Sequence, residues 1–65
     1  MIELHLKEYR VKKNITQEEL AIMCNVSRQT IISLENGTYN PSLLLAFKLA
    51  YSLEVSINHL VTYKH

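Results

Sequence analysis

Serine and threonine residues placed directly before apolar stretches constrain this chain more than any other feature of its sequence. Such a hydroxyl accepts a hydrogen bond from a free backbone N–H at a helix start, and a Glu three residues later can complete a reciprocal capping box. Thr16 and Glu19 have this spacing. Three serines also precede patterned apolar stretches, namely Ser27, Ser42 and Ser56. These signals predict four helices in succession.

The connections around these helices are short. A first helix is expected from about Leu6 to Asn14, before the capping box. Only Asn25 and the residue after it separate the second and third helices, and Asn tolerates the left-handed conformation that a tight turn needs. Asn36-Gly37 is typical of a helix end, since Gly also adopts that conformation at low cost. The sequence thus predicts two helices joined by a tight turn.

Apolar and polar residues alternate at both ends of the chain. Ile2 and Leu4 follow this pattern near the N-terminus, and Val61 and Tyr63 follow it near the C-terminus. These segments either pair as two short strands or remain frayed, because few residues carry the period. A chain of 65 residues forms one domain at most. We therefore expect an all-α fold with five compact helices over residues 1–65, with or without a small terminal antiparallel sheet.

Composition excludes several classes of protein. The formal net charge is +1, which gives no support to a polybasic nucleic-acid binder. The single cysteine, Cys24, rules out an internal disulfide framework, and no secretory signal is evident, so a cytoplasmic location is expected. The longest apolar run, Leu43 to Phe47, is far shorter than the about 20 residues that span a bilayer.

No residue pattern indicates catalysis. The three histidines, His5, His59 and His65, are too scattered for metal-ligand spacing, and no Ser/His/Asp or Cys/His set is evident. We expect no enzyme activity, no metal, no cofactor and no small-molecule ligand.

The third helix has two different faces. With about 100° of rotation per residue, Ile31 and Leu34 point one way. Four residues form a continuous arc on the opposite side, namely Arg28, Gln29, Ile32 and Ser33. Arginine can bond guanine bidentately, glutamine can bond adenine, and an apolar side chain can contact the thymine methyl group. This arc has two interpretations. It is either a surface that reads DNA bases or an ordinary solvated helix face, and the arc alone favours the second.

The order of several motifs makes the first of these interpretations the stronger one. The blocks Ile15-Thr16-Gln17-Glu18-Glu19-Leu20-Ala21, Val26-Ser27-Arg28-Gln29-Thr30-Ile31, Leu34-Glu35-Asn36-Gly37 and Asn40-Pro41-Ser42 occur in register. With them, nearly the whole chain from Leu6 to Leu60 resembles the lambda-repressor-like, xenobiotic-response-element (Cro-type) helix-turn-helix family. The resemblance implies a five-helix DNA-binding domain, usually dimeric on its operator, with the third helix in the major groove. Asn25 departs from the glycine that is frequent at its position.

The same resemblance implies roles for further residues. Backbone phosphate is expected to bind to Gln17, Ser27, Asn36, Thr38, Tyr39 and Asn40. Free N–H groups at a helix start and a loop rich in Gly and Asn agree with this role. The family pattern also contains an ion pair at the positions of Arg10 and Glu35, and Arg10 shares a helix face with Leu6, where an unpaired charge would be costly. We interpret this pair as structural.

The fourth helix carries more apolar residues than one face needs. Its expected core stripe consists of Leu43, Ala46, Phe47, Ala50 and Leu53. Leu44 and Tyr51 lie on the other side of the helix, where they either pack within the chain or form a homodimer interface. The expected interface consists of Leu44, Tyr51, Ile57, Leu60, Val61 and Tyr63.

Together these observations predict a sequence-specific transcriptional regulator. We expect it to bind double-stranded DNA at an inverted-repeat operator as a homodimer and to repress by occluding that site. An antitoxin or a restriction-modification controller would have the same fold. A protein-interaction module without DNA affinity is the alternative of a different class, and the low net charge of +1 is its main support.

Overall fold

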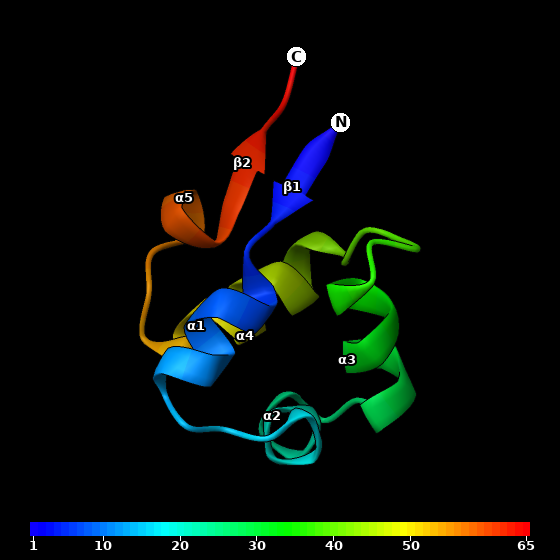
Figure 1. Ribbon diagram of the computed structural model, residues 1–65, viewed down its shortest axis with the longest axis vertical. Helices are drawn as coiled ribbons and strands as arrows, with labels where there is room; N and C mark the ends of the chain where they lie inside the picture. Colours follow the sequence, from blue (N-terminus) through cyan, green and yellow to red (C-terminus); the bar gives the residue numbers. More distant parts are fainter.

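Five short helices surround one apolar core, and two strands join the ends of the chain (Figure 1). The computed structural model describes residues 1–65. The elements in chain order are β1 (Ile2–Leu4), α1 (Leu6–Lys12), α2 (Gln17–Cys24), α3 (Arg28–Glu35), α4 (Leu43–Leu53), α5 (Ile57–Leu60) and β2 (Val61–Tyr63). The predicted five-helix fold with a small antiparallel sheet is confirmed.

All four predicted helix starts are present, and three of them have the expected capping hydrogen bonds. Thr16 Oγ1 accepts from the Glu19 N–H at 3.0 Å, and Glu19 Oε1 accepts from the Thr16 N–H at 2.8 Å. These contacts with the Thr16 backbone N–H and side chain favour the charged carboxylate and lower the pKa of Glu19. The Ser27 and Ser42 hydroxyls each accept a backbone N–H at 3.1 Å and so cap α3 and α4. Ser56 precedes α5 without such a bond.

A residue with left-handed backbone conformation follows each of the first four helices. Asn25 closes α2 with φ 57°, as predicted, and Gly37 follows α3 with φ 74°. Glu54 closes α4 with φ 57°. Asn14 also has a positive φ, 56°, and α1 ends before it, at Lys12 rather than at Asn14. The first helix is therefore shorter than expected because Asn14 turns the chain.

The termini pair in a two-stranded antiparallel sheet. Ile2 lies opposite Tyr63 and Leu4 opposite Val61. The His5 N–H donates to the Leu60 carbonyl at 2.8 Å and extends this ladder. The sheet lies at one end of the molecule, away from α2 (Figure 1). Of the two alternatives for the chain ends, strands are therefore correct.

The core corrects the expected orientation of α4. Leu43 and Phe47 are 74% and 52% exposed, so they do not belong to the core stripe. Leu49, which was not expected there, is completely buried. The buried arc of α4 consists of Ala46, Leu49, Ala50 and Leu53. These four residues recur at spacings of three and one, so they share one helix face and turn Phe47 outward.

Leu60 is also corrected. It was expected at a homodimer interface, but its side chain is 0% exposed and belongs to the core cluster. A side chain buried within its own chain cannot contact a second copy without unfolding. Cys24 lies in the same cluster, on the inner face of α2. None of the helices has the length and apolar character required to cross a membrane.

Candidate nucleic-acid interface

Helix α3 is fixed to the core by one side only. Ile31 and Leu34 are 0% and 1% exposed. On the opposite arc, Arg28 and Gln29 are exposed, whereas Ile32 and Ser33 are half-buried. The structure thus places all four predicted base-reading residues on the side of α3 that faces away from the core, although Ile32 is less accessible than the two residues at the helix start.

The polar groups of this arc are available for new partners. Gln29 Nε2 donates to Ser33 Oγ across one helix turn at 3.4 Å, a long contact that an external acceptor can replace. Arg28 takes part in none of the ion pairs of the chain. The arrangement therefore offers a planar cationic donor, an amide and a hydroxyl side by side, which are the groups that recognise base edges in a major groove.

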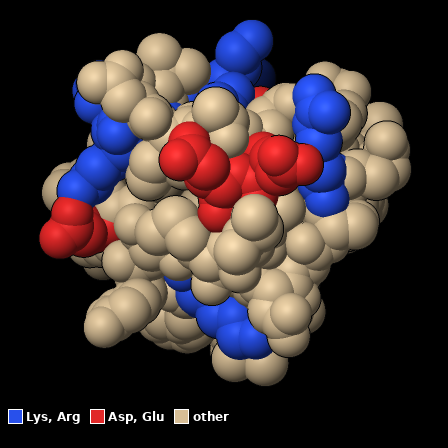
Figure 2. All heavy atoms as spheres, turned by 90° about the horizontal axis from the view of Figure 1, so that it is seen from below, with Lys and Arg blue, Asp and Glu red and all other residues tan.

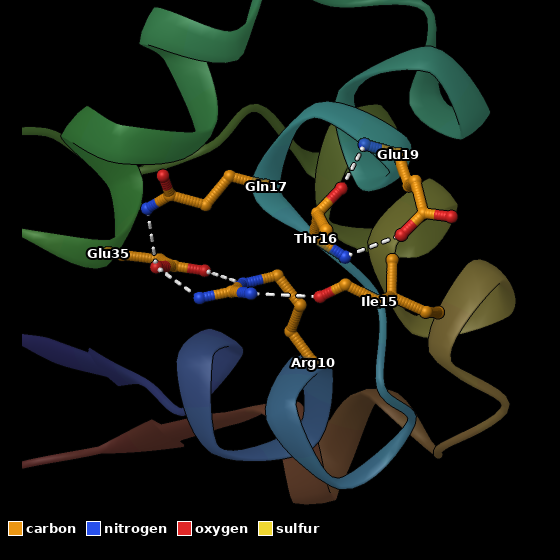
Figure 3. A network of polar contacts seen from close by, with 6 residues as sticks. All are labelled: Arg10, Ile15, Thr16, Gln17, Glu19 and Glu35. Carbon is orange, nitrogen blue, oxygen red and sulfur yellow. Dashed lines mark hydrogen bonds and ion pairs between the residues drawn. The ribbon is translucent and has the colours of Figure 1, made fainter.

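A buried polar network holds α3 against α1 and the start of α2 (Figure 3). Arg10 Nε donates to Glu35 Oε2 at 2.6 Å, and its Nη2 donates to Glu35 Oε1 at 3.2 Å. The remaining nitrogen, Nη1, donates to the Ile15 carbonyl at 2.8 Å. The two side chains are only 11% and 4% exposed. The Arg10–Glu35 pair expected from the sequence is therefore present and bidentate, the geometry that suits a desolvated ion pair.

Gln17 joins this network from the first residue of α2. Its Nε2 donates to Glu35 Oε1 at 3.1 Å, so the side chain is half-buried against the end of α3 (Figure 3). An amide nitrogen has two hydrogens, so the second remains available to a phosphate oxygen. The sequence placed Gln17 beside phosphate but gave no sign of its contact with Glu35.

The other candidate phosphate-binding residues lie at the two ends of α3. Ser27 is its N-cap, and four exposed residues follow its C-terminus, namely Asn36, Thr38, Tyr39 and Asn40. Thr38 Oγ1 donates to the Ser33 carbonyl at 3.0 Å, and Gly37 allows this close return of the chain. The loop is thus held near the end of α3, with exposed polar side chains and backbone.

An open hollow separates the first turns of α2 and α3. Its lining has no hydrophobic residue and consists of Arg10, Thr16, Gln17, Glu18 and Arg28. Sequence reasoning did not single out Glu18. Its position directly after Gln17, on the exposed side of the first turn, was the signal that could have found it.

Charge is dispersed over the surface. Figure 2 shows the face seen from below Figure 1, where a small acidic group lies near the centre and separate basic side chains surround it. This face carries no continuous basic patch, in agreement with the net charge of +1. Binding to a polyanion at this face would depend on a few placed contacts more than on a broad positive field.

Helix α4 carries an apolar surface of its own, which we call the α4 arc. It consists of Leu43, Leu44, Phe47 and Tyr51, with exposures of 74%, 66%, 52% and 87%. Leu44 and Tyr51 were expected to be exposed, whereas Leu43 and Phe47 are additions. Of the other residues predicted at an interface, Tyr63 is exposed on β2, and Ile57 and Val61 are half-buried against the core.

Comparisons with known proteins agree with this geometry. Residues 6–60 match the family described as helix-turn-helix. The chain is 52% identical over 59 residues to an uncharacterized HTH-type transcriptional regulator of Methanocaldococcus jannaschii, an alignment that covers 91% of this chain and 89% of the relative. It is 42% identical over 52 residues to the uncharacterized HTH-type transcriptional regulator YgzD of Bacillus subtilis, covering 77% of this chain and 79% of YgzD.

Two solved structures have a similar fold. The restriction-modification controller protein C.AhdI from Aeromonas hydrophila superimposes with a TM-score of 0.82 at 34% identity, covering 86% of this chain and 85% of C.AhdI. The N-terminal DNA-binding domain of SinR from Bacillus subtilis superimposes with a TM-score of 0.79 at 32% identity, covering 86% of this chain and 83% of that domain.

Proposed function

Because the chain belongs to the lambda-repressor-like helix-turn-helix family of DNA-binding transcriptional regulators, we propose that it represses transcription as a homodimer on an inverted-repeat operator. The observation that carries the proposal is the exposed arc of α3, on a helix whose other side is fixed by the core and by the Arg10–Glu35 pair. A reading surface has to be rigid, since misplaced donors lose their bidentate geometry.

The contacts with DNA divide into two groups. Arg28 and Gln29 lie at the N-terminal end of α3, the end that reads base edges in helix-turn-helix complexes. Ile32 and Ser33 extend this reading surface by one turn. Gln17, Ser27 and the loop from Asn36 to Asn40 contact phosphate and set the register of α3 in the groove.

The α4 arc is the proposed interface between two copies. Its four large apolar side chains, more than half exposed, lie together on one helix, and burying such surface against a second copy is favourable. Two-fold symmetry would make the contact self-complementary. At the edge of this dimer interface, further contacts would come from Ile57, Val61 and Tyr63.

A second copy also solves a problem of recognition. One helix reads only a few base pairs, too few for a unique site. Two copies related by a two-fold axis would place their α3 helices about 34 Å apart, one turn of the duplex. We therefore propose an operator of two half-sites whose centres lie about 10 base pairs apart.

Operator selection from random DNA tests the proposal directly. The expected consensus is an inverted repeat, and inserting about 5 base pairs between its halves should abolish cooperative binding, because the second half-site then faces the opposite side of the duplex. Binding of one chain to a single asymmetric site would contradict the dimer. Failure to select any sequence would favour a protein-interaction module instead.

The likeness to C.AhdI favours one alternative biological role, control of restriction-modification genes. An antitoxin of the same fold is the other alternative. The genes next to its own gene would distinguish it from a repressor and from a restriction-modification controller. A gel shift on the DNA upstream of its own gene distinguishes a DNA-binding regulator from a protein-interaction module without DNA affinity. We propose that this activity takes place in the cytoplasm and that residues 1–65 act as one domain, supported by their single core cluster.

A further inference from the structure

The hollow between α2 and α3 brings together two opposite charges that the chain leaves unpaired. Of its three charged lining residues, Arg10 is already bound to Glu35 and to the Ile15 carbonyl. Glu18 and Arg28 are both exposed and belong to none of the five ion pairs of the structure. The hollow therefore contains one carboxylate and one guanidinium without a charged partner.

Glu18 differs in this respect from the neighbouring carboxylate. Glu19 caps its own helix through the Thr16 N–H, whereas Glu18 makes no such contact. An acidic residue in the first turn of a helix is favourable through the helix dipole, which by itself would account for a glutamate here. The helix dipole alone, however, does not explain why Glu18 lines the same hollow as Arg28, the first residue of α3.

A carboxylate beside a phosphate-binding residue is unfavourable for binding a polyanion unless it has another task. The task available is to hold Arg28. A guanidinium has five N–H donors, and a bidentate contact with guanine uses only two of them. A carboxylate can bind the remaining edge, keep the plane of the guanidinium oriented and reduce the rotamer freedom lost on binding. The attraction becomes stronger once DNA covers the hollow and excludes water.

We propose that Glu18 is a specificity-determining residue, whose carboxylate pairs with Arg28 on the operator and orients the guanidinium toward a guanine. The inference rests on the proposed function, since it requires Arg28 to face base edges. It adds that the first turn of α2 contributes to base readout and not only to phosphate binding.

The test uses Glu18→Gln, with Glu3→Gln as the matched control. The control makes the same change of net charge at the terminal sheet, far from the hollow, where Glu3 pairs with Lys64. Arg28→Ala first identifies the guanine position that Arg28 reads. Competition binding then measures the affinity of each variant for three kinds of DNA: the selected operator, operators in which another base replaces that guanine, and random duplex.

For Glu18→Gln, the preference for guanine should fall at least threefold at that position, while affinity for random duplex stays equal or rises. Glu3→Gln should keep the preference within twofold of the wild type. In an Arg28→Ala background, adding Glu18→Gln should change the preference no further, because the group it orients is gone. If Glu18→Gln does not fold, Glu18→Asp keeps the charge but shortens the reach, and should lose part of the preference.

Two results would overturn the inference without affecting the proposed function. Equal tightening on every sequence would mean that Glu18 only repels phosphate. Unchanged preference with a lower melting temperature would mean that it only stabilises α2. A wild-type protein that binds operator and random duplex equally would instead overturn the proposed function, and the inference with it.

Discussion

Helices α3 and α4 begin with the same kind of cap but expose different surfaces, one polar and one apolar. Each starts at a serine whose hydroxyl accepts a backbone N–H at 3.1 Å, and each buries one stripe in the same core. The outward side of α3 begins with the polar pair Arg28 and Gln29, whereas the α4 arc is apolar. Capping and burial thus account for both helices, and the remaining side chains indicate which partner each is suited to contact.

The two helices also differ in how they are fixed. α3 is bound to its neighbours by the Arg10–Glu35–Gln17 network as well as by apolar packing. α4 relies on Ala46, Leu49, Ala50 and Leu53. A helix that has to position donors against base edges gains from directional contacts, whereas an apolar interface tolerates small shifts.

The largest expected effect comes from breaking the network that fixes α3. Arg10→Ala or Glu35→Ala should lower the free energy of unfolding by about 3 kcal/mol, because the remaining buried charge loses its partner. Thermal or urea unfolding measures this loss. The control is Lys12→Ala, which breaks an exposed pair with Glu8 and should cost less than about 1 kcal/mol. Equal unfolding of all three variants would mean that α3 needs no such network.

The polar side of α3 is tested by Arg28→Ala and Gln29→Ala. Each should cost about 1 to 3 kcal/mol of operator affinity, concentrated at one base position, where the preference should relax. Competition binding against singly substituted operators measures this. Asn40→Ala serves as the contrast, because Asn40 is exposed outside the Arg10–Glu35–Gln17 network and loss of a phosphate contact should weaken all sequences alike. A uniform loss for Arg28→Ala would place that residue with the phosphate contacts.

The apolar side of α4 is tested by Tyr51→Glu. A charge at this position should weaken self-association at least tenfold, about 1.4 kcal/mol, because the interface would bury an unpaired carboxylate. Sedimentation equilibrium without DNA gives the dimer constant. Ile22→Glu is the matched control, since Ile22 is a 74% exposed apolar residue on α2. If both variants associate like the wild type, the α4 arc is not the interface.

The smallest effect concerns the Thr16–Glu19 capping box at the start of α2. The pKa of Glu19 is lowered in the folded chain from an ordinary value of 4.5, chiefly by the Thr16 backbone N–H. The contribution of this carboxylate is therefore complete above about pH 5 and is lost as the pH falls through the folded pKa. Glu19→Gln should therefore lower the melting temperature slightly near pH 7, where the charge contributes, and the difference from the wild type should vanish as the pH falls through the folded pKa. A pH profile of melting temperatures identical to that of the wild type would contradict the role of the charge.

The sequence determined those features that depend on neighbouring residues. Thr16 and Glu19 lie within one helix turn, and Asn25 reaches a left-handed conformation without help from elsewhere, so both were predicted correctly. The same holds for the outward positions of Arg28 and Gln29, because burial of Ile31 and Leu34 fixes the rotation of α3. Pairing of Arg10 with Glu35 needed the family pattern, since 25 positions separate the two residues.

Only the tertiary structure decided which side of α4 is buried and where the other long-range contacts form. The sequence of α4 is so rich in Leu, Ala, Phe and Tyr that several of its faces are apolar enough to pack against the core. Periodicity therefore could not predict that Leu49 is buried and Phe47 exposed. Packing against α2 and α5 made that choice, and the same packing buried Leu60. The hydrogen bond of Gln17 to Glu35 and the shared hollow of Glu18 and Arg28 likewise join residues from different helices. Local patterns specify turns and caps because those are short-range, whereas contacts between helices depend on how every apolar face competes for one small core.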